Sequence, residues 1–216
     1  TDPVPGVSGI TYRNQLMANQ VLEVFGHIPE ELETFSLASQ IVQAEAKKFF
    51  VEIFRQQKWR TSGLLWWNMI DGWPQISDAV VDYYYTKKLA YYYLKRVHTP
   101  LCVIVREPGA WNSDVVVCND SLDTRKGHVR VWDAETDDVV LDSSFEVGEN
   151  ANALLERIKT PYSEQRLLLI EWTSGGERGV NHFLQGSPGF SLERYRSWLP
   201  KIAALDGSFE SSEIAR

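Results

Sequence analysis

The sequence has little of the features that mark several common protein classes. Only two of its 216 residues are cysteines, Cys102 and Cys118, and they lack zinc-ligand spacing and a CxxC partner. Buried free thiols are therefore expected, with a bridge between neighbouring strands left open. No apolar run reaches the length of a membrane span. The net charge of −7 comes without a basic face that could neutralise phosphates, so neither a nucleic-acid nor a membrane partner is expected.

Familiar catalytic signatures are also missing. The sequence contains no GxSxG elbow, no P-loop, no HExxH and no GxGxxG. Its four histidines are scattered through different predicted elements, which disfavours a metal cluster. Gly175–Gly179 resembles a phosphate loop only in composition and is expected to be a hairpin turn. We therefore predict neither a metal nor a cofactor. Asn119-Asp120-Ser121 fits the glycosylation sequon, but one such tripeptide is frequent by chance. A cytoplasmic and a periplasmic or secreted location therefore both stay open.

The first half of the chain has the periodicity of helices around one apolar segment. Helices are predicted at Tyr12–Phe25, Phe35–Gln57 and Thr86–Val97. Four charged residues of the longest helix lie mostly off its apolar stripe and should face solvent: Glu45, Lys48, Glu52 and Arg55. A strand buried on both faces is predicted to begin at Gly63. Since one strand needs neighbours, this half looks like part of a larger domain.

Beyond Pro100 the pattern changes to short alternating segments. Turn signals separate seven predicted strands: Leu101–Glu107, Asp114–Asn119, His128–Asp133, Val139–Val147, Ala153–Ile158, Leu167–Thr173 and Gly179–Gln185. This pattern is typical of an antiparallel sandwich of immunoglobulin type, although the Cys…Trp…Cys spacing of antibody domains is missing. Gly186–Pro200 is expected to be irregular, and Leu205–Arg216 to be frayed or a linker.

The stretch Gly63–Pro74 holds three tryptophans among twelve residues, more indole than a core strand needs. Side chains alternate across a strand, so Trp66 and Trp67 should point in opposite directions, one into a core and one toward a cavity. An aromatic plate flanked by the Asn68 amide and the Asp71 carboxylate suits a sugar, because the ring stacks on C–H faces and the polar groups bind hydroxyls. A buried strand end with a structural tryptophan cluster explains the same residues, so both interpretations stay open.

This stretch, reading Gly-Leu-Leu-Trp-Trp-Asn-Met-Ile-Asp-Gly-Trp-Pro, resembles the eighth barrel strand of glycoside hydrolase family 2 enzymes, especially the β-mannosidases. The likeness continues on both sides, in Ser39–Glu45, Asp82–Tyr84, Lys87–Tyr92, Lys95-Arg96 and Pro100. The seven predicted strands are similar to the immunoglobulin-like domain that follows the barrel in that family, and Asn181–Leu184 resembles its last strand.

The resemblance implies a (β/α)8 barrel whose active site lies at the C-terminal ends of its strands. Trp67 would stack on the sugar at the bond that is cut, and Trp73 would wall the pocket. Asn68 and Asp71 fall on positions that are polar in the family, and Asp71 matches a recurrent aspartate. Mannosidase relatives often carry Gln where this chain has Asn68, so the resemblance does not fix the sugar.

Members of the family hydrolyse glycosides with retention, through two glutamates whose carboxyls lie about 5–5.5 Å apart. The family motifs that carry them, Asn-Glu for the acid/base and Ser-Glu-Phe/Tyr-Gly for the nucleophile, do not occur here. A whole barrel takes about 250 residues. The resemblance thus implies the C-terminal part of a retaining exo-β-glycosidase, inactive alone and with no catalytic residue of its own. Its partners would be a carbohydrate substrate and the remainder of the parent enzyme.

The predicted fold class is an α+β multidomain fragment. Residues 1–99 would be the end of an incomplete (β/α)8 barrel, 100–186 an immunoglobulin-like β-sandwich, and 187–216 a linker or the start of a further domain. Leu64–Met69 would be an orphan strand, covered by its own helices or paired with another copy.

Two alternatives remain, a non-catalytic carbohydrate-binding module and an immunoglobulin-like interaction domain. A binding module displays its aromatics on the sandwich, whereas the cluster here precedes the predicted strands. An interaction domain would expose an apolar patch on those strands, and their alternation gives no sign of one.

Overall fold

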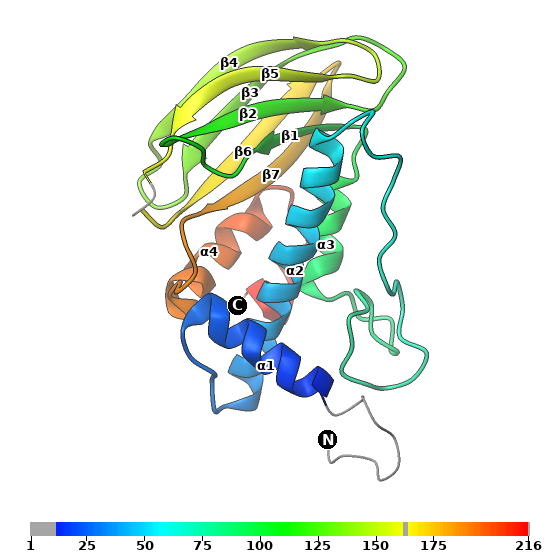
Figure 1. Cartoon of the computed structure of the whole chain (residues 1–216), viewed down its shortest axis with the longest axis vertical. Helices are drawn as coiled ribbons and strands as arrows, with labels where there is room; N and C mark the ends of the chain where they lie inside the picture. Colours follow the sequence, from blue (N-terminus) through cyan, green and yellow to red (C-terminus); the bar gives the residue numbers. More distant parts are fainter. Residues whose placement is uncertain (1–11, 162–163, 216) are drawn as a thin grey trace.

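The computed structural model describes residues 12–161 and 164–215, and every structural statement below refers to them. A group of helices lies beneath two antiparallel sheets, and one continuous apolar core runs through both parts (Figure 1). None of the described helices is long and apolar enough to cross a membrane.

Three helices lie close to their predicted positions: α1 at Tyr12–Phe25, α2 at Leu32–Gln56 and α3 at Leu89–Val97. The start of α2 is fixed by Glu31, whose carboxylate accepts hydrogen bonds from the backbone N–H groups of Glu33 at 2.9 Å and Thr34 at 2.7 Å. The buried face of α2 repeats with helical spacing, through Ala38, Ile41, Ala44 and Val51. The predicted helix periodicity is therefore confirmed.

The prediction of irregular chain over Gly186–Pro200 is wrong, because Leu192–Ala204 forms helix α4. Ser191 caps this helix by accepting a hydrogen bond from the Arg194 N–H at 3.1 Å. Its buried residues keep helical spacing: Leu192, Tyr195, Trp198, Leu199, Ile202 and Ala203. Leu205 and Phe209 are also buried, so the segment after α4 packs on the helices instead of fraying.

All seven predicted strands are present, each within three residues of its predicted bounds. One sheet has the order β1-β2-β5, built from Leu101–Val105, Asn112–Asn119 and Asn152–Lys159. The other has the order β4-β3-β6-β7, built from Val139–Val147, Arg125–Asp133, Arg166–Ser174 and Glu177–Gln185. Gly175 and Gly176 form the turn between β6 and β7 with φ of 59° and 83°, which confirms the predicted hairpin.

The two cysteines face each other in this fold. Cys102 of β1 and Cys118 of β2 are direct cross-strand partners, and both are buried free thiols, as expected. Asn119 of the sequon is buried, and its amide donates hydrogen bonds of 2.8 Å to the carbonyls of Asp123 and Gly148. The folded chain therefore does not offer this asparagine for glycosylation.

The prediction of a doubly buried strand at Gly63 is wrong. Residues 62–69 form no ladder with any described strand, and Leu65 is 99% exposed. Burial still alternates along the segment: Leu64 and Trp66 pack on the core, while Leu65 and Trp67 face outward. The chain is thus extended and buried on one side only, because no neighbouring strand supplies the other side or the hydrogen bonds.

The expected solvent-facing side of α2 is also buried. Lys48 and Glu52 are 2% and 4% exposed, and the Lys48 ammonium lies 3.2 Å from the Glu52 carboxylate. Asn181 of β7 donates to Glu52 at 2.8 Å, and His182 of β7 contacts Glu45 at 2.9 Å. The polar side of α2 is therefore covered by the edge of the second sheet, a contact that helical periodicity cannot reveal.

Candidate functional site

The long connection between α2 and α3 carries most of the chain's exposed aromatic residues. It swings out to one side of the helices in Figure 1 before it returns to α3. Two parts of it carry aromatic side chains: the tryptophan arm, residues 67–73, and the tyrosine arm, residues 83–85. The arms are joined where Ile70 bridges to Val81 and Val81 bridges to Lys87.

The two adjacent tryptophans point in opposite directions, as predicted. Trp66 is half-buried against the core, and the Lys47 ammonium of α2 lies 4.8 Å from the centre of its ring. Trp67 is 72% exposed, its carbonyl accepts a hydrogen bond from Lys47 at 3.5 Å, and its peptide bond to Asn68 is cis. Lys47 thereby fixes the backbone from which the exposed indole projects.

The two polar residues of the tryptophan arm have different environments. Asn68 is half-buried and makes no hydrogen bond to any described residue, so its amide can serve a ligand. Asp71 is buried, and its carboxylate accepts hydrogen bonds from Ser77, from Gln75 at 3.0 Å and from the Lys88 ammonium at 3.3 Å. Only part of its accepting capacity remains for anything else.

The protonation of Asp71 follows from these contacts. Burial alone would raise the pKa of its carboxyl, but the hydrogen bonds from Ser77 and Gln75 and the charge of Lys88 outweigh burial and lower it. A carboxyl with a lowered pKa stays ionised near neutral pH, so Asp71 is unsuited to be a general acid. Its contacts identify it as an anchor of the loop.

The tyrosine arm is a tight turn held by Asp82. One oxygen of the Asp82 carboxylate accepts hydrogen bonds from the N–H groups of Tyr84 at 2.8 Å and Thr86 at 2.7 Å. The rings of Tyr83 and Tyr84 meet edge to face, with centroids 5.3 Å apart. Between the arms lies a cleft of about 550 Å³, lined by Ile70, Asp71, Gly72, Tyr83, Tyr84 and Tyr85.

The structure thus brings the four predicted site residues onto one loop in unequal settings. Trp67 and Trp73, which are 72% and 64% exposed, present indole surface, and Asn68 presents a free amide. Asp71 lies beneath the surface. The residues that hold the loop are not among the predicted site residues: Lys47, Gln75, Ser77 and Lys88. Their roles depend on contacts across the loop, and no motif in the sequence signals them.

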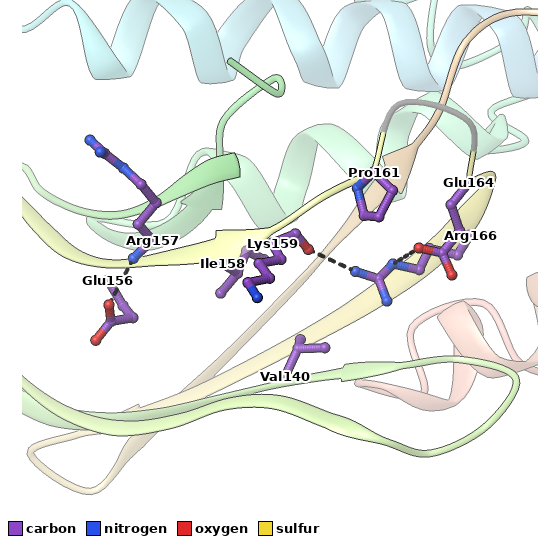
Figure 2. Close-up of a pocket in the computed structure, with 8 residues that line it drawn as sticks. All are labelled: Val140, Glu156, Arg157, Ile158, Lys159, Pro161, Glu164 and Arg166. Carbon is purple, nitrogen blue, oxygen red and sulfur yellow. Dashed lines mark hydrogen bonds and ion pairs between the residues drawn. The ribbon is translucent and has the colours of Figure 1, made fainter. Parts of the chain in front are cut away.

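A second cleft, of about 460 Å³, lies at the edge where the two sheets meet (Figure 2). Its lining comes from β4, β5 and the start of β6, and includes Arg157, Lys159 and Arg166. The Arg157 guanidinium donates to Asp114 at 2.9 Å, and Arg166 donates to the Lys159 carbonyl at 3.2 Å and lies 3.9 Å from Glu164. The arginines are therefore paired within the protein, and this cleft shows no reactive group. No group of metal-ligating side chains occurs among the described residues.

Known proteins resemble parts of this chain in sequence. The chain is 42% identical over 80 residues to "Beta-mannosidase B" of Aspergillus niger and 41% identical over 80 residues to that of Aspergillus terreus. Each match covers 35% of this chain and only 9% of the relative. No family model matches the sequence.

Solved structures match a larger share of the chain. The β-D-mannosidase of Dictyoglomus thermophilum superposes with a TM-score of 0.71 and 23% identity, covering 84% of this chain and 23% of that enzyme. The exo-chitosanase CsxA of Amycolatopsis orientalis superposes with a TM-score of 0.62 and 18% identity, covering 82% of this chain and 22% of that one. These likenesses show a shared fold, and the chain spans less than a quarter of each enzyme.

Proposed function

We propose, from the kinship of this chain with the β-mannosidases of glycoside hydrolase family 2, that it is the C-terminal part of a retaining exo-β-glycosidase. In this proposal the chain binds and positions a terminal β-linked sugar, for which a β-mannoside is the test substrate. The nucleophile and the acid/base glutamates belong to a part of the enzyme outside this chain, since neither family motif occurs in the sequence.

The outward-facing indole of Trp67 is the observation that carries the proposal. A large apolar ring that is 72% exposed, beside an amide with no partner, offers both halves of a sugar contact: a stacking face and a hydrogen-bonding group. Trp67 would stack on the sugar ring, Asn68 would bind a hydroxyl, and Trp73 would close one side of the site. Asp71 would lie beneath, where its carboxylate can still accept a hydrogen bond.

The proposed domain organisation follows from the same relationship. Residues 62–69 would be a strand of the (β/α)8 barrel, whose neighbours would cover the outward side chains Leu65 and Met69. Trp67–Trp73 would then lie at the C-terminal end of that strand, where barrel active sites form. The strand orders β1-β2-β5 and β4-β3-β6-β7, with the chain changing sheets after β2, β4 and β5, support an immunoglobulin-like sandwich.

An activity assay and a binding assay together test this function. The 216-residue chain should not hydrolyse an aryl β-mannoside, whereas an enzyme that also contains the preceding barrel strands should. Trp67→Ala in that enzyme should lower kcat/KM by roughly tenfold, as expected for losing about 1–3 kcal/mol of aromatic stacking in a desolvated pocket. Trp59→Ala, which removes another exposed indole, is the control and should leave kcat/KM unchanged.

Two results would refute the proposal. Hydrolysis by the isolated chain that disappears in Trp67→Ala would place the catalytic groups within these residues. An unchanged kcat/KM after Trp67→Ala in the larger enzyme would show that the sugar does not stack on this indole.

A further inference from the structure

The two cysteines of the chain lie opposite each other in the first sheet, where β1 and β2 run side by side (Figure 1). Cys102 and Cys118 are partners in the antiparallel register, so their side chains point to the same face of the sheet. The sequence has no other cysteine, and one intrachain bridge is therefore the only one that it allows. The sugar-binding function proposed above uses neither residue.

The backbone hydrogen bonds indicate how far apart the two residues are. The Asp120 N–H donates to the Pro100 carbonyl at 2.8 Å, two residues before Cys102 in the register. Hydrogen-bonded pairs recur at every second residue along an antiparallel ladder, so Cys102 and Cys118 form a pair of this kind as well. The Cα atoms of such a pair are about 5.5 Å apart, within the range of about 4.4–6.8 Å that disulfides span.

A bridge between these residues needs only a small movement of β1. Directly opposed Cβ atoms lie about 4.5–5.5 Å apart, against about 3.5–4.5 Å in a disulfide, so the two side chains must approach by roughly 1 Å. β1 is the edge strand in the order β1-β2-β5, and no described strand forms a ladder with its other side. It can therefore shift toward β2 without breaking a second ladder.

Burial decides when the thiols can react. Both side chains are fully buried, and burial raises the pKa of Cys102 far above its ordinary value and that of Cys118 to about 11. Because the thiolate is the species that attacks a disulfide, both thiols react slowly inside the fold. The unfolded chain exposes them with ordinary reactivity. A bridge should therefore form while the chain folds, and the folded reduced chain should resist oxidation.

We propose that Cys102 and Cys118 are an intrachain disulfide site, which closes when the chain folds in the presence of a small disulfide such as oxidised glutathione. One cysteine thiolate attacks that disulfide and forms a mixed disulfide, and one reduced glutathione leaves. The other cysteine thiolate then attacks the cysteine sulfur of the mixed disulfide, and a second reduced glutathione leaves. The cysteines lose two electrons, which reduce the oxidised glutathione, and their two protons end on the released thiols. This site is independent of the proposed sugar binding.

The bridge should stabilise the folded chain. It closes a loop over residues 103–117, which lowers the conformational entropy of the unfolded state. For a loop of this length in a chain of this size, the melting temperature should rise by about 5–10 °C.

Refolding in two redox buffers tests the site. The 216-residue chain is unfolded in urea with a reductant and refolded either with reduced glutathione alone or with oxidised glutathione added. Both products are then alkylated with iodoacetamide in denaturant and measured by mass spectrometry. Both cysteines should be alkylated after the first treatment and neither after the second, in which the peptides that contain Cys102 and Cys118 should be joined. The bridged product should show the higher melting temperature.

Cys102→Ala and Cys118→Ala are the controls. Each should have the same melting temperature after both treatments, and the comparison is made within each variant so that its own loss of stability cancels. The folded reduced chain, given oxidised glutathione in native buffer, should lose its thiols at least about tenfold more slowly than the unfolded chain. In urea just below the unfolding transition, where molecules open repeatedly, the bridge should form without complete refolding.

Several results would overturn the site. Cysteines that both remain open to alkylation after oxidative refolding, or that carry glutathione without being joined, would show that the pair does not close. Disulfide-linked dimers in place of the intrachain bridge would show the same. A bridged chain that melts below the reduced one would show that the native sheet does not accommodate the bond. If the chain does not refold from urea, the reaction just below the transition decides between these results and the bridge.

Discussion

Glu45 shows how a single half-buried carboxylate can join several elements of this molecule. It lies on α2 and contacts His182 of β7, Tyr195 of α4 and the Lys48 ammonium on its own helix. Tyr195 in turn lies 3.0 Å, oxygen to oxygen, from Tyr93 of α3. Burial would raise the pKa of Glu45, but His182, Lys48 and the hydrogen bonds outweigh it and lower it to about 2. The fold therefore depends on this carboxylate being ionised.

The same cluster predicts a loss of stability in acid. Burial lowers the pKa of His182 to about 4, against an ordinary value of 6.5, so between these values the unfolded chain binds a proton that the folded chain does not. Stability should therefore fall as the pH drops from about 6.5 toward 4, and Glu45 should extend the loss below pH 4.5. The melting temperature should fall by several degrees over the first interval.

His182→Gln provides the comparison for this titration, because glutamine can donate to Glu45 and does not titrate. Its melting temperature between pH 6.5 and 4 should depend less on pH than that of the wild type. His128→Gln, at an exposed histidine of β3, is the matched control for the loss of one histidine. Parallel slopes for His182→Gln and wild type would show that the buried histidine is not the titrating group.

At the scale of elements, the loop between α2 and α3 should depend on Asp71. Asp71→Ala removes the carboxylate that accepts from Ser77, Gln75 and Lys88, and it leaves Lys88 with the Ser77 carbonyl at 3.4 Å, in a part of the loop that has little other regular structure. The amide hydrogens of Asp71 and Val81 should then exchange with solvent at least tenfold faster, which hydrogen-exchange mass spectrometry of the 69–88 segment can measure.

Asp78→Ala is the matched control for the loop, because the hydrogen bond of Asp78 runs through its backbone carbonyl, which accepts from Gln43 at 2.8 Å, and its carboxylate acts on Lys47 through charge alone. Its exchange pattern should match the wild type. If Asp71→Ala also matched the wild type, the hydrogen bonds between Val81 and the tryptophan arm would have to hold the loop without the carboxylate.

Among the elements, local sequence patterns predict some and miss others. Strands such as Val139–Val147 were predictable because alternation and turn residues are local signals. Irregular chain is the wrong prediction for Gly186–Pro200 because proline is a local signal against helix, whereas Pro200 lies inside helix α4. Alternation predicted only that Trp66 and Trp67 point in opposite directions, and the family resemblance indicated that Trp67 is the outward one. The burial of Asp71 and Glu52 followed from neither, because it depends on partners distant in the sequence, Lys88 and Asn181.

At the scale of the whole molecule, the helices and the sheets meet through two half-buried cations, Arg55 and Lys58. Arg55 donates to the carbonyl of Thr99 at 2.7 Å and lies 2.9 Å from Asp120. The Lys58 ammonium donates to the Asn119 carbonyl at 2.9 Å and to the Asn150 side chain at 3.0 Å, and it also pairs with Asp120. Together with the shared apolar core, these contacts tie the two parts into one body.

This junction predicts that the chain unfolds in a single cooperative step. Circular dichroism and tryptophan fluorescence should give coincident urea transitions, because neither part can lose its structure without exposing the junction of the other. Lys58→Met should lower the free energy of unfolding by about 1–3 kcal/mol, since it removes one donor from three oxygen acceptors at a partly buried position, of which Asp120 keeps its pair with Arg55. Lys126→Met, which breaks only the exposed pair with Glu146, should change it by less than about 1 kcal/mol. Two separate transitions, with Lys58→Met shifting neither, would mean that the sheets fold as an independent domain and that the junction contributes no coupling.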